Sequence, residues 1–558
     1  MLKRAHLGNK VYLSTVSGVV TTKTDLIEYA DKNLDGLSVI TTKSFQVIPN
    51  PGNREPIICE TTPDNFGNSV GLRNPGMEIA LKELKDLRNR RQLRCFLNVS
   101  VSADNAEDFI TLVRAFDSIA DSIELNFSCP HAKAGFGSSI GSDAAIAGDY
   151  VRKIKAGVPS QRSLLIVKLT PNVNDIASIA KEVIKSGADG IAAINTVGPS
   201  IHMDKTSGKP ILQNSIGGKG GCSGEWVKDR ALKCVKEIRD AVGDDVIIFG
   251  MGGVSTGEDV YNMVKAGADV VGIGSVFAKV NQKKWNIYLS ALKKEAEELL
   301  EHKEVTIASK DMISGKLSME YKEHTIEKIV RHSNDIYIFT LSGKIENKAG
   351  EFVFLWIPGV GEKPFSVADS SVPVFIIKRR GPFTEALFQM KTGEKVYSRG
   401  IYGAPLENRK TENALLIAGG TGEAVLVGVA EKLSKQGTKM EFLVGTSSDK
   451  GGIMQEKLSL YGSYKAVFDD GKPGRVLDFI KIQNLDTAVY IVGPEIFMAR
   501  AAEAVLAEGV DEDDIYVSME KSTRCGIGLC GECSCGGRLT CQWGTFMNYR
   551  FLREENVL

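Results

Sequence analysis

Short apolar runs rich in β-branched residues recur through the first half of the chain, and most are separated by segments of helical periodicity. The runs occupy 11–15, 37–42, 95–99, 122–126, 164–169, 190–195, 246–250 and 270–274. Eight buried strands alternating with helices are typical of a parallel (β/α)8 barrel. Two Rossmann-like domains would alternate similarly, but they place a glycine-rich phosphate loop after their first strand, and here such loops follow the late runs. We therefore expect an α/β chain that begins with a (β/α)8 TIM barrel over 1–305.

The hydrophobic pattern changes twice after the barrel. A polar stretch without period, 306–317, predicts a linker. Apolar and polar residues then alternate in short runs, which predicts an antiparallel β-barrel over 318–410. Strand and helix patterns return over 411–515 and predict a small parallel α/β domain. The cysteine-rich segment 516–558 completes the predicted organisation.

The composition is that of an ordinary globular protein, with 43% hydrophobic and 25% charged residues. Sixty-nine basic residues balance 69 acidic ones, so we expect neither nucleic acid nor an anionic membrane as partner. No uncharged apolar run is long enough for a transmembrane helix or a signal peptide. These features favour a cytoplasmic enzyme that acts on small molecules and make a membrane quinone an unexpected electron acceptor.

Polar residues and glycines stand at the carboxyl ends of the predicted barrel strands, where the active sites of such barrels form. In chain order they are Ser17, Lys43, Asn98, Asn126, Lys168, Asn195, Gly252 and Gly274. Three asparagines and two lysines suit an anionic ligand with amide groups. The loops GMGG (250–253) and GIGS (272–275) follow the seventh and eighth runs, a position that favours a phosphate-bearing cofactor.

The segment ELNFSCPHAKAGFG (124–137) places Cys129 in a polar loop just past a strand. A free thiol has a pKa of about 8.5, so a modest decrease would make it a general base. The alternative is a half-buried, inert cysteine.

Six motifs in this order resemble class 1 dihydroorotate dehydrogenases. They are NSVGLRNPG (68–76), NFSCPH (126–131), VKLTPN (167–172), INT (194–196), GGCSG (220–224) and GMGGV (250–254). The resemblance implies that Cys129 takes a proton from C5 of dihydroorotate while a hydride leaves C6 for FMN. It implies substrate contacts from Lys43, Asn68, Val70, Gly71, Leu72, Asn126, His131, Asn195 and Thr196. It implies FMN contacts from Ser17, Lys43, Asn98, Asn126, Lys168, Gly224, Gly252, Gly253, Gly274 and Ser275.

Two positions depart from the family pattern. His131 stands where the family usually has asparagine, and Thr15–Gly18 reads T-V-S-G where the family tends to have N-A-S-G. A C-P-H loop is similar to that of dihydropyrimidine dehydrogenases, so uracil or thymine is a rival substrate. The N-S-V-G-L stretch looks like the carboxylate-binding loop of the orotate enzymes, and the four-cysteine runs of the catabolic enzymes do not occur. Orotate is therefore the favoured product.

Two further motifs follow the barrel. The sequence KPFSV (363–367) resembles the FAD site of ferredoxin–NADP reductase-like proteins, which implies FAD contacts from Lys363, Pro364, Phe365, Ser366 and Gly403. The segment LLIAGGTGEAVL (415–426) reads as a strand, a glycine turn and a helix, which suits a pyrophosphate. Candidate NAD positions are Gly419, Gly420, Thr421, Gly493 and Pro494. A purely structural α/β unit is the alternative.

Five of the ten cysteines fall near the C-terminus. The spacing Cys525-x4-Cys530-x2-Cys533-x7-Cys541 is close to the plant-type 2Fe–2S pattern, with a short last gap. A structural zinc site is the alternative, and Cys535 is assigned no ligand role. This region resembles the electron-transfer subunit of class 1B dihydroorotate dehydrogenases.

The order of these motifs implies a catalytic subunit fused to its electron-transfer subunit, with electrons passing from dihydroorotate through FMN, the 2Fe–2S cluster and FAD to NAD+. The resemblance also implies a homodimer through the barrel. Two other hypotheses remain open: a pyrimidine reductase or dihydropyrimidine dehydrogenase of altered specificity, and an electron-transfer or ligand-binding module without turnover.

Overall fold

The structure is a computed structural model that describes residues 10–127, 140–314, 317, 319–369, 372–446, 451–468 and 475–558. The chain divides into two compact units. The first is drawn from Met1–Met203, Lys209–Leu317 and Ile527–Glu532. The second is drawn from Asp204–Gly208, Ser318–Gly526 and Cys533–Leu558.

The first unit contains a closed barrel of eight parallel strands in the order β1-β12-β11-β8-β7-β6-β5-β2, which confirms the predicted (β/α)8 barrel. The strands are β1 (Leu13–Thr15), β2 (Leu37–Thr41), β5 (Phe96–Val101), β6 (Ser122–Asn126), β7 (Leu164–Lys168), β8 (Gly190–Ala193), β11 (Ile247–Met251) and β12 (Val270–Ile273). One core cluster joins Val39, Ile166, Phe249 and Val270 from four of these strands. The register of β6 and β7 pairs Asn126 with Lys168, so two polar side chains reach the same rim.

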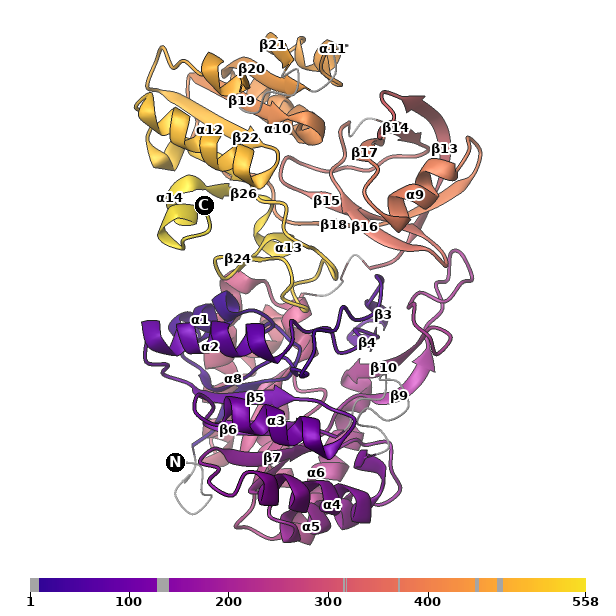
Figure 1. Cartoon of the computed structure of the whole chain (residues 1–558), viewed down its shortest axis with the longest axis vertical. Coiled ribbons are helices and arrows are strands. Elements are labelled where there is room, and N and C mark those ends of the chain that lie inside the picture. The colour runs from indigo at the N-terminus through magenta and orange to yellow at the C-terminus, as the bar shows by residue number, and fades with distance from the viewer. Residues whose placement is uncertain are drawn as a thin grey trace. The chain divides into compact units, whose positions relative to one another are not determined.

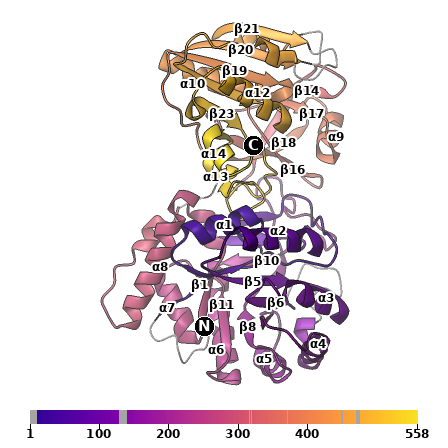
Figure 2. The same ribbon diagram turned by 60° about the vertical axis from the view of Figure 1, so that its left-hand side comes forward.

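Eight helices alternate with the barrel strands and surround them (Figures 1 and 2). They are α1 (Thr24–Asn33), α2 (Met77–Arg90), α3 (Ala106–Phe116), α4 (Ala144–Gly157), α5 (Ile176–Lys185), α6 (Lys228–Val242), α7 (Gly257–Ala266) and α8 (Trp285–Leu300). In α3 the buried residues Phe109, Val113 and Phe116 recur at helical spacing, and the Asn105 side chain caps the first turn. Burial of one apolar face against the strands thus fixes the helix on the barrel.

A four-stranded antiparallel sheet in the order β3-β4-β10-β9 accompanies the barrel and was not predicted from the hydrophobic pattern. Its strands are β3 (Ile58–Thr62), β4 (Asn65–Asn68), β9 (Val197–Ile201) and β10 (Lys219–Gly224). Because β10 is glycine-rich and β9 is largely exposed, neither strand shows a clear alternation of apolar and polar residues.

Part of the predicted linker packs on the barrel. The short 3-10 helix Ala308–Met312 contains the fully buried Ser309, whose hydroxyl donates to Glu295 Oε2 of α8 at 2.6 Å. Hydrogen bonding to this buried carboxylate holds the segment in place, a contact that sequence periodicity does not reveal.

The second unit begins with a six-stranded antiparallel sheet in the order β16-β15-β18-β13-β14-β17. Its strands are β13 (Lys322–Arg331), β14 (Ile336–Leu341), β15 (Phe352–Ile357), β16 (Gly361–Phe365), β17 (Val374–Lys378) and β18 (Lys395–Tyr402), with α9 (Pro382–Gln389) before the last. The Ala368 amide donates to the Val374 carbonyl, and Asp369 forms a bridge with Val374. The segment after β16 therefore meets β17 and brings the two ends of the sheet together.

A second six-stranded sheet follows in the order β21-β20-β19-β22-β23-β26, parallel except for β26. Its elements are β19 (Asn413–Gly419), α10 (Glu423–Gln436), β20 (Lys439–Thr446), α11 (Gln455–Leu458), β21 (Gly462–Phe468), β22 (Thr487–Val492), α12 (Glu495–Ala507), β23 (Ile515–Ser518) and β26 (Phe546–Asn548). Alternate residues of β19 enter two core clusters: Leu416 packs with α10, and Leu415 packs with α12. The two helices thus cover opposite faces of this sheet.

The C-terminal segment is built into the same sheet. Strands β23 and β26 pair through Val517 and Met547, and the cysteine-rich stretch runs between them. The small elements of this region are β24 (Ser534–Cys535), β25 (Arg538–Leu539), α13 (Thr540–Trp543) and α14 (Tyr549–Glu554). The segment 516–558 is therefore not a separate domain, because strands on both sides of its cysteine-rich stretch belong to the parallel domain's sheet.

Candidate active site and electron-transfer sites

A cavity at the carboxyl ends of the barrel strands collects most of the residues assigned from the sequence. Those that line it are Ser17, Lys43, Asn68, Val70, Gly71, Leu72, Asn126, Lys168, Asn195, Thr196, Gly224, Gly252, Gly253, Gly274 and Ser275. They come from loops far apart in the chain, and the closed barrel brings them to one rim. The cavity can therefore hold a ligand among amide, hydroxyl, ammonium and backbone groups.

Three assigned residues are not placed in the cavity. Asn98 lies within the barrel, where its amide donates to Thr41 Oγ1 at 3.2 Å and its carbonyl accepts from Ser122 Oγ at 2.7 Å. Its contacts are thus to neighbouring strands rather than to the rim. Cys129 and His131 lie outside the described residues.

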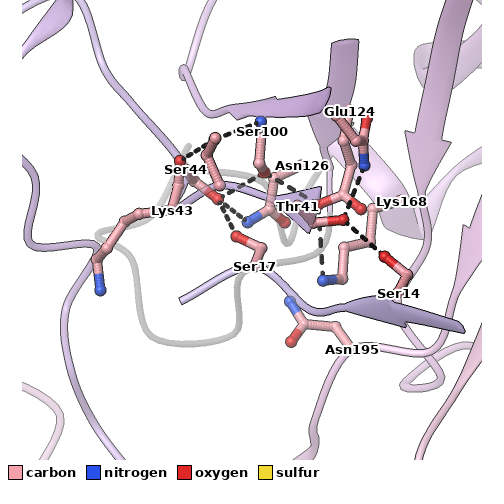
Figure 3. Close-up of polar contacts among 12 residues, drawn as sticks. Ser14, Ser17, Thr41, Lys43, Ser44, Ser100, Glu124, Asn126, Lys168 and Asn195 are labelled. Carbon is pink, nitrogen blue, oxygen red and sulfur yellow. Dashed lines mark hydrogen bonds and ion pairs between the residues drawn. The ribbon is translucent and has the colours of Figure 1, made fainter. Parts of the chain in front are cut away.

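A chain of polar contacts joins the cavity-lining residues Ser17 and Lys168 through side chains inside the barrel (Figure 3). The Ser17 and Ser44 hydroxyls lie 2.9 Å apart, as do those of Ser44 and Ser100. The Ser100 hydroxyl donates to Glu124 Oε1 at 2.9 Å, and Glu124 lies 3.7 Å from the Lys168 ammonium. This network fixes the ammonium of a cavity-lining lysine against a buried carboxylate.

Sequence reasoning missed Ser44 and Glu124. Ser44 directly follows Lys43 after β2, and Asn126 Nδ2 donates to its hydroxyl at 3.1 Å. Glu124 is the one charged residue of the fully buried strand β6 (Ser-Ile-Glu-Leu-Asn) and is 1% exposed. A buried charge of this kind is rare without a partner, so its place in the strand was the available signal.

We expect Glu124→Gln to lower the free energy of unfolding of the barrel by about 3–5 kcal/mol, because the buried Lys168 ammonium loses its counter-charge. Urea-dependent hydrogen exchange of barrel peptides measures this change without interference from the second unit.

Glu182→Gln is the matched control, because its ion pair with Arg152 lies at the surface of the same barrel. Its expected effect on stability is negligible, because water screens an exposed ion pair. Equal effects of the two substitutions on the free energy of unfolding would show that the buried Glu124–Lys168 pair stabilises the barrel no more than a surface pair does.

The glycines after β11 fit a phosphate group. Gly252 and Gly253 have φ of 130° and 74°, conformations that side chains rarely adopt. A Cβ on Gly252 would lie 2.8 Å from Ala231 Cβ, and one on Gly253 would lie 2.7 Å from Lys228 Cβ. The absence of side chains therefore lets this loop pack closely on α6. Its backbone lines the cavity, as phosphate loops after late barrel strands do.

The cavity also has a lining residue from the cysteine-rich segment. Leu529 lies on its wall, and Ile527–Glu532 belongs to the same compact unit as the barrel. The Val20 amide donates to the Leu529 carbonyl at 3.0 Å, and the Thr22 hydroxyl donates to the Cys530 carbonyl at 3.0 Å. This placement could not be read from spacing, because it joins residues some 500 positions apart.

A groove in the second unit contains four of the five residues assigned to FAD. Lys363, Pro364, Phe365 and Ser366 line it at the end of β16. Gly403 does not line this groove, and its amide instead donates to the Cys541 carbonyl at 2.9 Å. Contact between Gly403 and FAD therefore stays a prediction that this groove does not support.

A second groove contains every residue assigned to NAD. Gly419, Gly420 and Thr421 follow β19, and Gly493 and Pro494 follow β22. Strand order reverses between β19 and β22, with β20 and β21 on one side and β23 on the other. Open parallel sheets bind ligands in the crevice at such a switch point, so the groove lies where a nucleotide is expected.

The two grooves of the second unit share part of their walls. Lys378, Arg380, Thr421, Met519, Glu520 and Lys521 line both of them. Ligands in the two grooves would therefore approach each other beside three cationic side chains.

The C-terminal cysteines assigned to a cluster are buried. Cys533 Sγ and Cys541 Sγ lie 3.3 Å apart, and the Cys541 thiol lowers the pKa of Cys533. Cys535 packs instead into the apolar core around Val517. Among the described residues, no three His, Cys, Asp or Glu side chains are grouped so as to hold a single metal ion.

None of the helices within the described ranges combines the length and apolar character that crossing a membrane requires.

Comparison with known proteins places the barrel in a family. The family model described as dihydroorotate dehydrogenase matches residues 3–299. The catalytic subunit of dihydroorotate dehydrogenase B (NAD(+)) from Methanocaldococcus jannaschii is 39% identical over 243 residues, which cover 43% of this chain and 75% of that protein. The corresponding subunit from Alkaliphilus metalliredigens is 39% identical over 263 residues, covering 47% of this chain and 82% of that protein.

A crystal structure of DHODH in complex with ferulenol from Eimeria tenella is 20% identical, covers 54% of this chain and 84% of that chain, and has a TM-score of 0.43. The matches to the two catalytic subunits each cover less than half of this chain. Since the family model spans more than half of it, and the relatives are matched over most of their own length, the chain belongs to the dihydroorotate dehydrogenase family.

Proposed function

We propose that this protein oxidises dihydroorotate to orotate in pyrimidine biosynthesis and passes the electrons through FMN, a 2Fe–2S cluster and FAD to NAD+. The observation that carries the proposal is the single barrel cavity in which amide side chains, Lys43, Lys168 and the glycine loops meet. Membership of the dihydroorotate dehydrogenase family supports the same reaction. The names of the relatives support NAD+ as acceptor.

The residues of the cavity suit each part of the substrate. Asn68, Asn126 and Asn195 offer donors and acceptors to the amide edges of a pyrimidine ring. The backbone of Gly71 and Leu72, together with Lys43, suits the carboxylate. Cys129 would take the proton from C5, and correct placement of this thiol and the ring makes the transfer fast.

FMN, when bound, supplies the hydride acceptor for C6. Lys168 would lie against the flavin and offset the negative charge of its reduced ring, with Glu124 holding the ammonium in place. The glycine loops after β11 and β12 would hold the phosphate. These roles use the groups that the cavity brings together.

The second unit would conduct the electrons. The groove at Lys363 suits FAD, and the groove at Gly419 and Gly493 suits NAD+. The adjacent, buried Cys533 and Cys541 suit one iron of a cluster held by four thiolates. Fusion of the two subunits in one chain raises the effective concentration of each for the other. We also propose a homodimer through the barrel, which a mass measurement in solution tests.

The test of the substrate is anaerobic bleaching of the visible flavin band by dihydroorotate, dihydrouracil and dihydrothymine. We expect rapid bleaching by dihydroorotate alone. Bleaching by a dihydropyrimidine without a carboxylate, and not by dihydroorotate, would replace the substrate, as the C-P-H loop around His131 allows. Absence of bleaching by all three would contradict a catalytic barrel.

A further inference from the structure

A charged pair is buried in the antiparallel sheet of the second unit. Arg399 of β18 is 2% exposed and Glu362 of β16 is 1% exposed. Arg399 Nε donates to Glu362 Oε2 at 2.7 Å, and Arg399 Nη2 donates to Oε1 at 2.5 Å. The two groups thus form a bidentate pair that none of the steps above uses.

Aromatic side chains enclose this pair. The guanidinium carbon of Arg399 lies 4.1 Å from the centre of the Phe354 ring and 5.2 Å from that of Tyr402. Arg399 Nη1 donates to the Tyr402 hydroxyl at 2.6 Å, and the Tyr321 hydroxyl donates to Glu362 Oε2 at 2.7 Å. The arginine is therefore held in one orientation.

One remaining donor of Arg399 reaches the cysteine-rich segment. Nη1 also donates to the main-chain carbonyl of Cys525 at 3.0 Å. Four residues further along the chain, the Gly403 amide donates to the carbonyl of Cys541 at 2.9 Å. The end of β18 thus binds the backbone of two of the four cysteines assigned to the cluster.

The packing around this contact is close. Gly526, directly after Cys525, has φ of 82°, and a Cβ there would lie 3.0 Å from the rings of Phe354 and Tyr402. Burying two charges costs desolvation energy that an apolar pair would avoid. We therefore expect the buried Arg399, which donates to the Cys525 carbonyl, to have a function besides packing.

We propose that Arg399 is a positioning residue for the iron–sulfur centre: it fixes the backbone at Cys525, and its charge, balanced by Glu362, sets how readily the centre accepts an electron. This inference rests on the cluster assigned in the proposed function. A cluster held by four thiolates is anionic and gains negative charge on reduction, so an uncompensated charge next to Cys525 changes its electron affinity.

Two single substitutions test the charge, because they change it in opposite directions. Arg399→Gln leaves the Glu362 carboxylate unbalanced and should make the cluster harder to reduce. Glu362→Gln leaves the guanidinium unbalanced and should make it easier to reduce. We expect each to shift the one-electron equilibrium about tenfold, which is about 59 mV. An anaerobic reductive titration of the full-length protein, followed by electron paramagnetic resonance of the reduced cluster, measures both shifts.

Arg409→Gln is the matched control, because Arg409 pairs with Asp486 and Asp514 elsewhere in the same unit and is half exposed. It should leave the cluster spectrum and potential unchanged. Shifts in the same direction for Arg399→Gln and Glu362→Gln, or wild-type potentials in both, would overturn the proposal. Wild-type protein without iron would instead overturn the cluster assignment itself.

The double variant Arg399→Gln/Glu362→Gln keeps the test decisive if a single variant fails to fold. It restores charge balance, so the potential should return towards that of the wild type. It still weakens the hydrogen bond to Cys525, so iron should be lost to a chelator faster than from the wild type at equal FAD content. Unchanged iron retention would contradict the positioning role.

Discussion

Cys129→Ser is expected to slow flavin reduction by dihydroorotate about 100- to 10,000-fold while leaving NADH-driven dye reduction intact. A thiol with a pKa of about 8.5 supplies the thiolate base near neutral pH, whereas a serine hydroxyl stays protonated there, and a positioned base contributes a factor of this size. Dye reduction by NADH needs only the second unit under the proposed route. Anaerobic stopped-flow absorbance with dihydroorotate, and steady-state dye reduction with NADH, measure the two activities separately.

Two other thiols of the barrel make this experiment specific. Cys95 lies just before β5, away from the rim, and burial raises its pKa to about 12. Cys95→Ser is therefore the control and should leave the rate of flavin reduction unchanged. Cys222 lines the cavity itself, and burial raises its pKa. If Cys222→Ser abolished flavin reduction and Cys129→Ser did not, the base would be Cys222. If Cys129→Ser reduced both activities together, Cys129 would have a structural role.

The barrel could be predicted because its information is local. Each of the eight strands is a short apolar run, and each ends at a loop whose polar residues can be read directly. The end of β7 at Lys168 and the end of β6 at Asn126 illustrate this, since closure of the barrel brings strand ends to one rim whatever the intervening sequence. The same reasoning placed Gly419 and Gly493 at one crevice, because they follow neighbouring parallel strands.

The parts that could not be predicted depend on contacts between distant residues. Glu124 and Ser44 form their network only when three strands are in register, and periodicity gives no register. Asn98 was assigned to the rim because it stands near the end of the apolar run 95–99, yet β5 continues to Val101 and the Asn98 amide faces Thr41 and Ser122 inside the barrel. Pairing with β6 extends β5 beyond the apolar run, so the run alone does not locate the rim.

The C-terminal segment also depends on contacts with residues far away in the chain, which its sequence alone does not reveal. Cysteine spacing indicated a metal centre but not its surroundings. Arg399 carries no motif, and its contact with Cys525 arises from the fold of the antiparallel sheet. Gly403 was assigned to FAD from a family resemblance, whereas its amide donates to the Cys541 carbonyl.

Cys530→Ser is expected to remove the visible absorbance of the cluster and to uncouple the two halves of the protein. Substitution of a hydrogen-bond partner of a metal ligand already lowers metal affinity or activity by about 10- to 100-fold. Loss of a thiolate ligand should therefore slow the reduction of NAD+ by dihydroorotate by more than 100-fold. Flavin bleaching by dihydroorotate and flavin reduction by NADH should both persist, because each needs only its own half. Visible circular dichroism, iron content and the three activities of the full-length protein measure these effects together.

Cys535→Ser is the control for this experiment, because Cys535 lies only five residues from Cys530 and packs in the apolar core of the parallel domain. Its substitution should leave the cluster spectrum and the coupled activity in place. An unchanged spectrum in Cys530→Ser would contradict the assigned ligand set, and an equal loss in Cys535→Ser would show that the segment tolerates no change at either thiol. Loss of the coupled activity in Cys530→Ser and not in Cys535→Ser would mean that electrons leave the barrel cavity only when the thiolate of Cys530, on the loop beside that cavity, is present.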